Sequence, residues 1–412
     1  MNLLQIRVGL VLGVALAVVL KAHGLQQVHA RFPFVVTWDD HELTNDAWHG
    51  GAQNHSEDEG SWNQRKMWAV RAYYEWMPIR EPAVADQQWR ALEIGDLATL
   101  IMLETRLSAR DRQPSLGDAP LKTVALDLSN PDQPRLAQDG TSAAATRVVD
   151  LPFDVSQSPP VPLTDPAQIL ALSREEELPP GLDYLPDVDR LEAELLNDPA
   201  RQLLGETQRS FIRQQLEESA KQNKTWQIIG NQTLLTPVTA PDVSNAYSEE
   251  EFAALPSYVS EFIPWTSQGI PLGTDSWNGY GAERSWFLGE AAKNGSNIVV
   301  LTGDTHAAWG MNLEGPGSWQ GIELGTTSIS SPGFPQSFSL PADAIESRLK
   351  AANPQLRYSE VTHRGYLTLT LTADDARVTF HRVSDVKTRQ FDVDRNHRFV
   401  LTPGSGNGVR WS

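Results

Sequence analysis

The chain of 412 residues contains no cysteine. A disulfide framework, a thiolate nucleophile and a zinc site with cysteine ligands are therefore excluded. Positive charge is also scarce, because 34 basic residues face 52 acidic ones and leave a net charge of −18. A protein that wraps the backbone of a nucleic acid needs a basic surface, so this balance argues against a nucleic-acid scaffold. It suits a soluble protein, or one that holds cations.

One long apolar run, residues 8–20, opens the chain and contains thirteen apolar or glycine residues. A membrane span needs about 18 or more, so the run better fits the hydrophobic region of a secretory signal. Residues 28–30 offer a small-x-small cleavage pattern, and no twin-arginine pair is present. We expect residues 1–24 to be a hydrophobic leader, signal or anchor, and the protein to be extracytoplasmic: secreted, periplasmic or membrane-anchored. Membrane contact is expected through this segment only. The alternatives are a buried helix or a start region foreign to the domain.

Two helix–strand units predict an α/β fold. Helical periodicity over residues 205–223 is followed by an apolar strand with a polar tip at residues 226–233. Residues 283–295 then predict a second helix, and residues 297–310 a second strand with a polar tip. This order favours a sheet that carries ligand groups at the carboxyl ends of its strands. In the tail, strict alternation over residues 366–372 predicts an antiparallel hairpin with one exposed face.

The domain organisation follows from a change of composition. Residues 61–78 predict a helix, and residues 97–106 predict a buried strand that ends in polar residues. Residues 107–199 are rich in proline, aspartate and serine and have few periodic runs, which is typical of a long surface insertion. We expect residues 25–412 to form one domain, interrupted by this insertion at about residues 107–199.

The stretch FPFVVTWDDHE combines a buried strand pattern with four titratable side chains. Residues 32–38 have the β-branched and aromatic composition of an interior strand. Asp39, Asp40, His41 and Glu42 follow without a break. Charges at the edge of a core are costly unless solvent exposure, ion pairing or a metal ion compensates them.

Three strand tips offer carboxylates, imidazoles and amides: residues 38–42, 230–232 and 303–309. Such ligands suit calcium, magnesium, manganese, iron or zinc. Asp304 and His306 are separated by one residue, so in extended backbone they lie on one face, as two ligands of one ion would. Each motif alone is more often a surface loop, a solvated helix start or a turn than a metal site. Their shared position after apolar strands favours a metal site.

Several motifs, in this order along the chain, resemble the bacterial alkaline phosphatase D family, a branch of the calcineurin-like metallophosphoesterases. They are FPFVVTWDDHELTNDAW, WQIIGNQ, DSWNGYGAERSWFL, VVLTGDTHAAWGMNL, ELGTTSISSPG and HRGYLTLTL. The resemblance covers roughly residues 25–382 and is poor over 107–199. It implies a four-layer ββ sandwich flanked by helices, a multinuclear metal site at the strand ends and hydrolysis of phosphate monoesters or diesters.

The resemblance also implies roles for individual residues. Asp40 falls where the superfamily supplies a metal ligand, and Asp39 beside it is a further candidate. His41 falls on the histidine that contacts phosphate or protonates the leaving group. GDTH is similar to the family's second histidine motif, which makes Asp304 and His306 a ligand pair.

Two further residues are assigned by the same resemblance. Asn231 is a candidate metal ligand or phosphate contact, and Arg284 is a candidate phosphate partner, although a surface arginine on a helix needs no special role. We expect calcium and iron as the cofactors, with zinc or manganese as alternatives. The expected substrate is a small-molecule or polymeric phosphate ester. Metal-activated water needs no protein nucleophile, which agrees with the absence of a GxSxG motif.

The chain departs from the family pattern at its beginning. Family members carry a first strand, an aspartate-bearing GD motif and often an iron-binding cysteine and tyrosine upstream of DDHE. We therefore expect a fold that is incomplete at the N-terminus and lacks half of the metal site. Either the functional form extends further upstream, or the chain is a weakly active or inactive metal- or phosphate-binding remnant. A glycosidase using Asp39 and Asp40 is disfavoured, because adjacent strand residues point to opposite faces.

Overall fold

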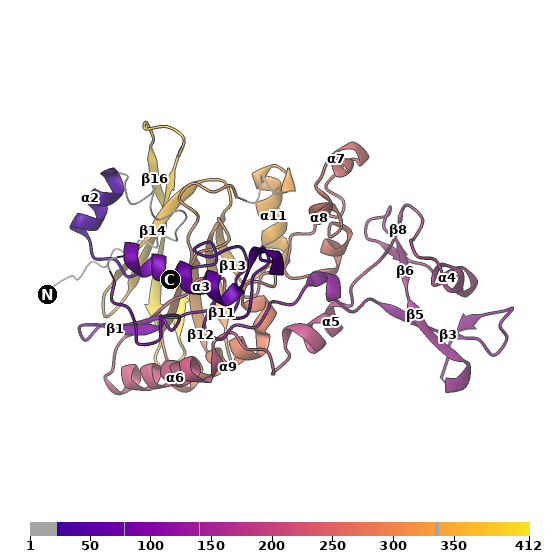
Figure 1. The fold of residues 1–412 in the computed structure, drawn as a ribbon, viewed down its shortest axis with the longest axis horizontal. Coiled ribbons are helices and arrows are strands. Elements are labelled where there is room, and N and C mark those ends of the chain that lie inside the picture. Colours follow the sequence, from indigo (N-terminus) through magenta and orange to yellow (C-terminus); the bar gives the residue numbers. More distant parts are fainter. Residues whose placement is uncertain (1–22, 78, 140, 334–337) are drawn as a thin grey trace.

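A computed structural model of the chain describes residues 23–77, 79–139, 141–333 and 338–412 (Figure 1). Its largest element is a seven-stranded mixed sheet. In spatial order the strands are β1 (Arg90–Ile94), β2 (Ala98–Met102), β9 (Trp226–Gly230), β10 (Ile298–Thr302), β12 (Gln320–Gly325), β11 (Ala308–Glu314) and β13 (Leu356–Glu360).

Four neighbouring strands of this sheet, β2, β9, β10 and β12, run parallel to one another. Every residue of β2, β9 and β10 is buried, as expected for strands covered on both faces. Because the strands are parallel, their carboxyl ends meet at one edge of the sheet. The residues that follow these ends are therefore brought together, whatever their distance along the chain.

A second, antiparallel sheet packs against one face of the first. Its strands are β14 (Arg364–Leu371), β15 (Ala376–Val383), β16 (Val393–Pro403) and β17 (Val409–Trp411). Leucines 367, 369 and 371 of β14 join apolar residues of β2, β9 and β10 in one buried cluster. Tyr366, on the opposite face, is 42% exposed. The predicted hairpin with one exposed face is thus confirmed.

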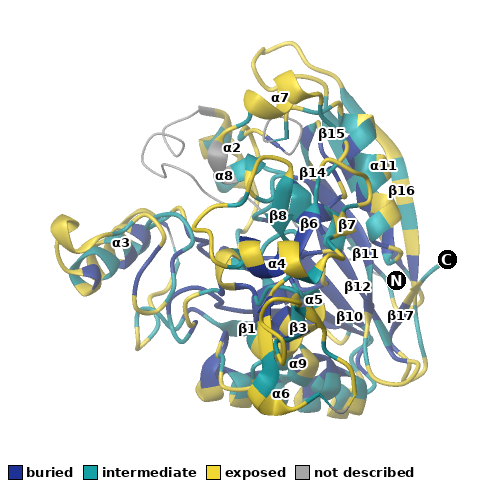
Figure 2. Cartoon of the chain, turned by 90° about the vertical axis from the view of Figure 1, so that its right-hand side faces the viewer, coloured by how far each residue is buried: buried dark blue, intermediate teal, exposed yellow. Residues whose placement is uncertain are grey.

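Helices cover the other face of the seven-stranded sheet. They are α6 (Gly205–Lys221), α9 (Gly281–Lys293) and α11 (Ala342–Ala352), whose apolar residues pack against the sheet in two further clusters. Figure 2 shows exposed outer faces on α6 and α9 and buried strands behind them. The predicted α/β class with two packed sheets is confirmed. In the described part of the chain, helices flank the larger sheet, while the outer face of the smaller sheet is partly exposed.

Residues 107–199 contribute no strand to the seven-stranded sheet. They form two small sheets, which extend to the right in Figure 1. One contains β4 (Arg135–Leu136), β3 (Thr123–Asp127) and β5 (Thr146–Asp150), and the other contains β7 (Val161–Pro162), β6 (Pro152–Asp154) and β8 (Leu182–Tyr184). The helices of this segment are α4 (Pro166–Leu172) and α5 (Val188–Leu191). Two short helices, α7 (Glu249–Ala253) and α8 (Ser257–Ser260), lie between β9 and β10 in the sequence. The division into one domain with an insertion stays a prediction.

The N-terminal part begins with α2 (His23–Arg31). The apolar run at residues 8–20 lies outside the described residues. Within the described ranges, no helix is long and apolar enough to cross a membrane.

The prediction of an interior strand at residues 32–38 is wrong, since this segment is irregular. Phe32 and Val35 are exposed, whereas Val36 and Trp38 are buried. The segment packs against a helix and not within a sheet. Trp38 meets Tyr73 and Tyr74 edge to face on α3 (Trp62–Trp76), the helix predicted at residues 61–78. The apolar residues of the segment are therefore buried by side-chain packing without strand pairing.

Candidate metal centre and active site

Polar side chains gather at the edge where β2, β9 and β10 end. Residues 103–106 follow β2, Asn231 follows β9, and Asp304 lies two residues beyond β10. Asp39 and Asp40 approach from the irregular N-terminal segment. Asp39, Asp40 and Asp304 each offer an oxygen atom, and these atoms all lie within 4.8 Å of one another. We call these three residues the acidic cluster. It joins two sequence motifs that are more than half of the chain apart.

A fully buried arginine lies among these carboxylates. The Arg106 guanidinium donates from Nε to Asp39 Oδ1 at 2.6 Å, from Nη1 to Asp275 Oδ2 at 2.6 Å and from Nη2 to Asp304 Oδ1 at 3.2 Å. Arg110 donates a further bond to Asp275. Burial would raise the pKa of Asp275, but Arg106 and Arg110 hold it below the usual value. Asp275 is thus neutralised by two arginines, whereas the other carboxylates share one.

Burial raises the pKa of four of the remaining carboxyl groups around Arg106. Burial raises the pKa of Asp39 to about 6, although Arg106 is bonded to it. Burial also raises the pKa of Asp46 to about 6 and that of Glu42 to about 7. The pKa of Asp304 lies well above its ordinary value, first because of burial and then because of the Asp39 carboxylate. A cation placed here would relieve this repulsion.

The DDHE segment is held by hydrogen bonds of its own backbone. The Asp46 N–H donates to Asp40 Oδ2 at 2.8 Å, and the Asp39 N–H donates to Glu42 Oε2 at 2.9 Å. Asp40 is nearly buried, while the side chain of His41 is 54% exposed. His41 Nε2 lies 4.0 Å from Asp40 Oδ2. The imidazole therefore stands at the solvent side of the acidic cluster.

The GDTH segment forms a tight turn and not the extended backbone assumed from its spacing. Asp304 and His306 have φ values of 69° and 57°, and the Thr305 N–H donates to the Gly303 carbonyl at 2.8 Å. Left-handed backbone is unfavourable for residues with a side chain and clusters at functional sites. His306 lies outside the 4.8 Å set. Its Nδ1 faces the Pro332 carbonyl at 2.8 Å, and donation there leaves the Nε2 lone pair available to a ligand.

Asn231 retains an unused acceptor. Its Nδ2 donates to the Thr233 carbonyl at 2.7 Å. Its Oδ1 is buried and has no hydrogen-bond partner among the described residues. A buried polar atom is rarely left without a partner. In this orientation Asn231 presents an oxygen, which suits a cation better than it suits a phosphate oxygen.

Arg284 is not brought to the acidic cluster by any contact of the described chain. It lies on α9, where Nη1 donates to the Trp277 carbonyl at 3.3 Å. Burial lowers its pKa, and the nearby Glu192 partly offsets this. These contacts belong to the helical layer.

Sequence reasoning missed the residues that support the cluster. Glu104 accepts from Trp38 Nε1 at 2.9 Å and from the N–H groups of residues 106–108, each at 2.8 Å. Glu104 and Arg106 were visible as the polar end of the strand at residues 97–106. Asp275 lies in the DSWNGY motif, which carried the resemblance without a role for its aspartate.

The donor set fits a cation. Three carboxyl groups supply oxygen atoms that all lie within 4.8 Å of one another, within reach of a common ion. The free Oδ1 of Asn231 adds an amide oxygen of the kind that hard cations bind. The imidazole of His306 would extend the choice to iron or zinc.

Two packed sheets with an oxygen-rich site at the strand ends give the chain an α/β architecture with a candidate metal centre. Comparison with known proteins identifies the family. The sequence model of the PhoD-like phosphatase family matches residues 15–380, and the chain belongs to this family. The resemblance drawn from the motifs is thereby confirmed.

Alkaline phosphatase D of Bacillus subtilis (strain 168) is similar to this chain. It is 25% identical over 361 residues, which cover 84% of the chain and 44% of the relative. A solved structure titled "Structure of PhoD" superposes with a TM-score of 0.60 at 23% sequence identity. The match covers 94% of this chain and 56% of the chain in that structure. This likeness shows the fold. The chain spans about half the length of both relatives.

Proposed function

We propose that the chain hydrolyses phosphate esters at the acidic cluster with the help of bound metal ions. The carrying observation is that Asp39, Asp40 and Asp304 converge at the strand ends, with one oxygen atom of each within 4.8 Å of the others. Asp39 and Asp304 share Arg106, and burial raises the pKa of both. Family membership supports phosphoester hydrolysis as the reaction class. The proposed substrate is a small-molecule or polymeric phosphate ester, and the proposed location is extracytoplasmic.

The metal ligands proposed are Asp39, Asp40, Asp304, Asn231 and His306. Calcium and iron are the proposed ions, with zinc or manganese as alternatives. A bound ion would reduce the repulsion between the phosphate anion and the attacking hydroxide and lower the pKa of water. Arg106 is bonded to Asp39 and Asp304, and a bound ion would share these two carboxylates with it.

His41 is the proposed proton donor. Its imidazole is exposed enough to meet substrate, and its Nε2 lies 4.0 Å from Asp40 Oδ2, on the solvent side of the acidic cluster. A protonated Nε2 would donate to the ester oxygen as the bond to phosphorus breaks, so the alcohol leaves neutral. A contact to a phosphate oxygen from the same nitrogen is compatible with this role.

Arg106 is proposed to position the carboxylates without touching the substrate. It is fully buried and bonded to both Asp39 and Asp304, so it fixes two ligands that come from distant segments. Glu104 and Asp275 hold Arg106 and its loop in place. The assignment of Arg284 to phosphate binding gains no support from its contacts at Trp277.

The test is hydrolysis of an aryl phosphate and of a bis-aryl phosphate by the purified chain. We expect turnover of at least one ester in the presence of calcium and iron, and its loss after exhaustive chelation. Asp394→Asn, a change in an ion pair of the smaller sheet, serves as the matched control and should keep activity. Turnover that survives chelation would refute the metal mechanism. Metal binding without turnover of either ester would identify a binding remnant and refute the hydrolase.

A further inference from the structure

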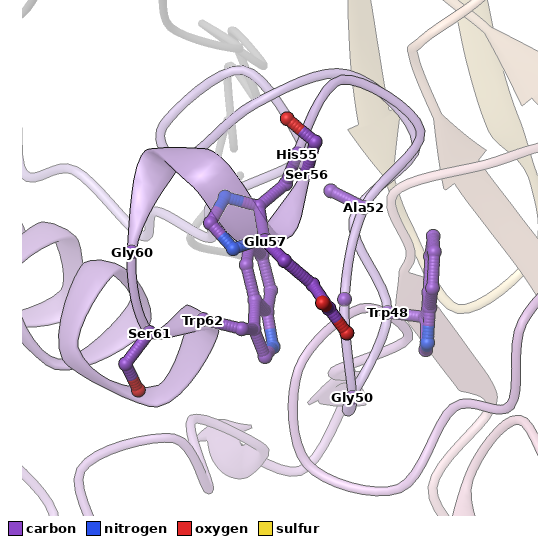
Figure 3. Close-up of a pocket in the computed structure, with 10 residues that line it drawn as sticks. Trp48, Gly50, Ala52, His55, Ser56, Glu57, Gly60, Ser61 and Trp62 are labelled. Atoms are coloured by element: carbon purple, nitrogen blue, oxygen red, sulfur yellow. The ribbon is translucent and has the colours of Figure 1, made fainter.

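The loop that follows the DDHE segment in the chain forms a pocket of its own. It is a surface pocket of about 590 Å³ formed entirely by residues 48–62. Figure 3 shows Trp62 on one side, Trp48 on the other and the side chain of Glu57 directed into the space between Trp62 and the backbone of residues 50–52. None of these residues takes part in the hydrolysis proposed above. We call this hollow the tryptophan pocket.

The tryptophan pocket is tied to the acidic cluster by a short, fixed piece of chain. The Asp46 N–H donates to Asp40 Oδ2. Trp48 follows Asp46 by two residues, so the Cα atoms of Asp46 and Trp48 are at most about 7 Å apart. The His49 N–H donates to the Arg110 carbonyl at 3.0 Å, and its own carbonyl accepts from Trp62 Nε1 at 3.0 Å. The pocket wall and the metal site are thus parts of one bonded loop. A group attached to a phosphate ester could reach the wall.

The walls favour a positive group. Indole faces carry the negative part of the ring quadrupole and attract cations. Trp48 already contacts one cation, since the Arg112 guanidinium lies 5.7 Å from its ring centre. Trp62 is packed against His55, with the ring centres 5.3 Å apart, and is only 8% exposed, so it offers the pocket a small, fixed surface.

The carboxylate of Glu57 strengthens this preference. It lines the pocket, and no hydrogen bond or ion pair of the described residues occupies it. Glu59, two residues on, differs because it is paired with Arg65 at 3.3 Å and with His55 at 3.5 Å. An unpaired carboxylate beside an indole repels phosphate and attracts an ammonium group.

We infer that the tryptophan pocket binds an ammonium group carried by the alcohol portion of the substrate. The inference rests on the proposed phosphoesterase function and specifies its substrate class: phosphate esters of amino or quaternary ammonium alcohols. The metal site would hold the phosphate, and the tryptophan pocket would hold the cation. A neutral alcohol of the same shape lacks both attractions and is a poorer ligand.

Binding can be measured without turnover. We would titrate the full chain by calorimetry with choline and with 3,3-dimethylbutan-1-ol, its neutral isostere. Choline should bind about 5- to 30-fold more tightly. Glu57→Gln should remove most of this preference and Glu57→Lys all of it. Glu249→Gln, an exposed glutamate on α7, is the matched control and should leave the preference unchanged. Equal binding of the two alcohols, or a preference that Glu57→Lys retains, would overturn the inference.

Kinetic measurements then test the pocket assignment and the proposed hydrolysis separately. The ratio of kcat/KM for phosphocholine to that for 3,3-dimethylbutyl phosphate should exceed about 5 and fall toward 1 in Glu57→Gln. If neither ester is hydrolysed while choline still binds preferentially, the proposed function fails and the pocket stands. If both esters are hydrolysed with a ratio near 1, the function stands and the pocket assignment fails. Tighter binding of adenosine than of choline would instead identify a stacking site for a nucleobase.

Discussion

Two regions of this molecule pair arginine with carboxylates, and they differ in charge balance. In the acidic cluster, Arg106 is bonded to Asp39 and Asp304, yet the pKa of both carboxyls is raised. In the smaller sheet and its neighbour, Arg382 is bonded to Glu360 and Asp394. We call Glu360, Arg382 and Asp394, with His363 and His397 beside them, the Glu360 cluster.

Both carboxyl groups of the Glu360 cluster have lowered pKa values. Burial would raise the pKa of Glu360, but the backbone N–H groups of residues 362 and 363 and the side chain of Arg382 hold it below the usual value. Hydrogen bonds from Arg382 and from the Asn396 backbone lower the pKa of Asp394. The comparison teaches that paired charges alone do not mark a site. In the acidic cluster, burial keeps the pKa of Asp39 and Asp304 raised beside Arg106, and the two come together with Asp40; this combination makes the acidic cluster the candidate site.

The largest contrast is expected in stability. Arg106→Gln leaves three carboxylates of a buried network without their shared cation, and breaking such a network costs about 3–5 kcal/mol of unfolding free energy. Arg382→Gln should cost clearly less, since its side chain and that of Asp394 are each 28% exposed. Urea unfolding of both variants in chelator measures the difference. Equal losses would erase the distinction between the clusters.

Activity should separate the same regions. Asp304→Asn removes a proposed metal ligand, and even outer support of a metal site is worth about 10- to 100-fold, so we expect a loss of at least about 100-fold in kcat/KM. Asp394→Asn should change kcat/KM by less than about twofold. An aryl phosphate with calcium and iron in excess is the assay. A twofold effect of Asp304→Asn would remove Asp304 from the site.

The histidines provide a finer contrast, because the proposed role of His41 depends on the leaving group. His41→Ala should lower kcat/KM by about 100-fold for an alkyl phosphate, whose alcohol needs a proton, and by less than about tenfold for a nitrophenyl ester. His397→Ala should affect neither ester. The two esters are compared under the same metal conditions. A uniform loss on both would assign His41 to phosphate binding instead of proton transfer.

The smallest effect is the pH dependence of stability. A carboxyl whose folded pKa is raised stabilises the fold below its unfolded pKa, near 4, and loses that contribution as the pH rises through the folded pKa. With folded values of about 6 for Asp39 and Asp46 and about 7 for Glu42, the window is about pH 4 to 7. In chelator, the unfolding free energy should therefore fall from about pH 4 to pH 7, and saturating metal should flatten the profile. An unfolding free energy that rises with pH over this range in chelator would contradict the raised pKa values of these carboxyl groups.

Much of the sheet edge could be predicted from the sequence. β9 and β10 are fully buried and are followed by polar residues, so the pattern placed Asn231 and Asp304 at strand tips, while their roles came from the family resemblance. Residues 32–38 were mispredicted because a short apolar run looks the same whether it pairs with strands or packs on a helix. There the side-chain packing of Trp38 on α3 decided the structure.

The support of the site could not be predicted in this way. Arg106 meets Asp275 across 169 residues, and no local pattern encodes such a contact. The turn at residues 303–306 was also missed, because the spacing of Asp304 and His306 fits extended backbone as well as the left-handed turn observed. Both failures concern charges and strained backbone that only tertiary packing stabilises.

The central claim is that the acidic cluster binds a cation and the Glu360 cluster does not. The most direct test is the thermal unfolding of wild type, Asp304→Asn and Asp394→Asn, with calcium and with chelator. At about 100 times the dissociation constant, calcium should add about 2.7 kcal/mol to wild type and to Asp394→Asn. Asp304→Asn should gain little or nothing. No gain in wild type, or an equal gain in Asp304→Asn, would contradict the account.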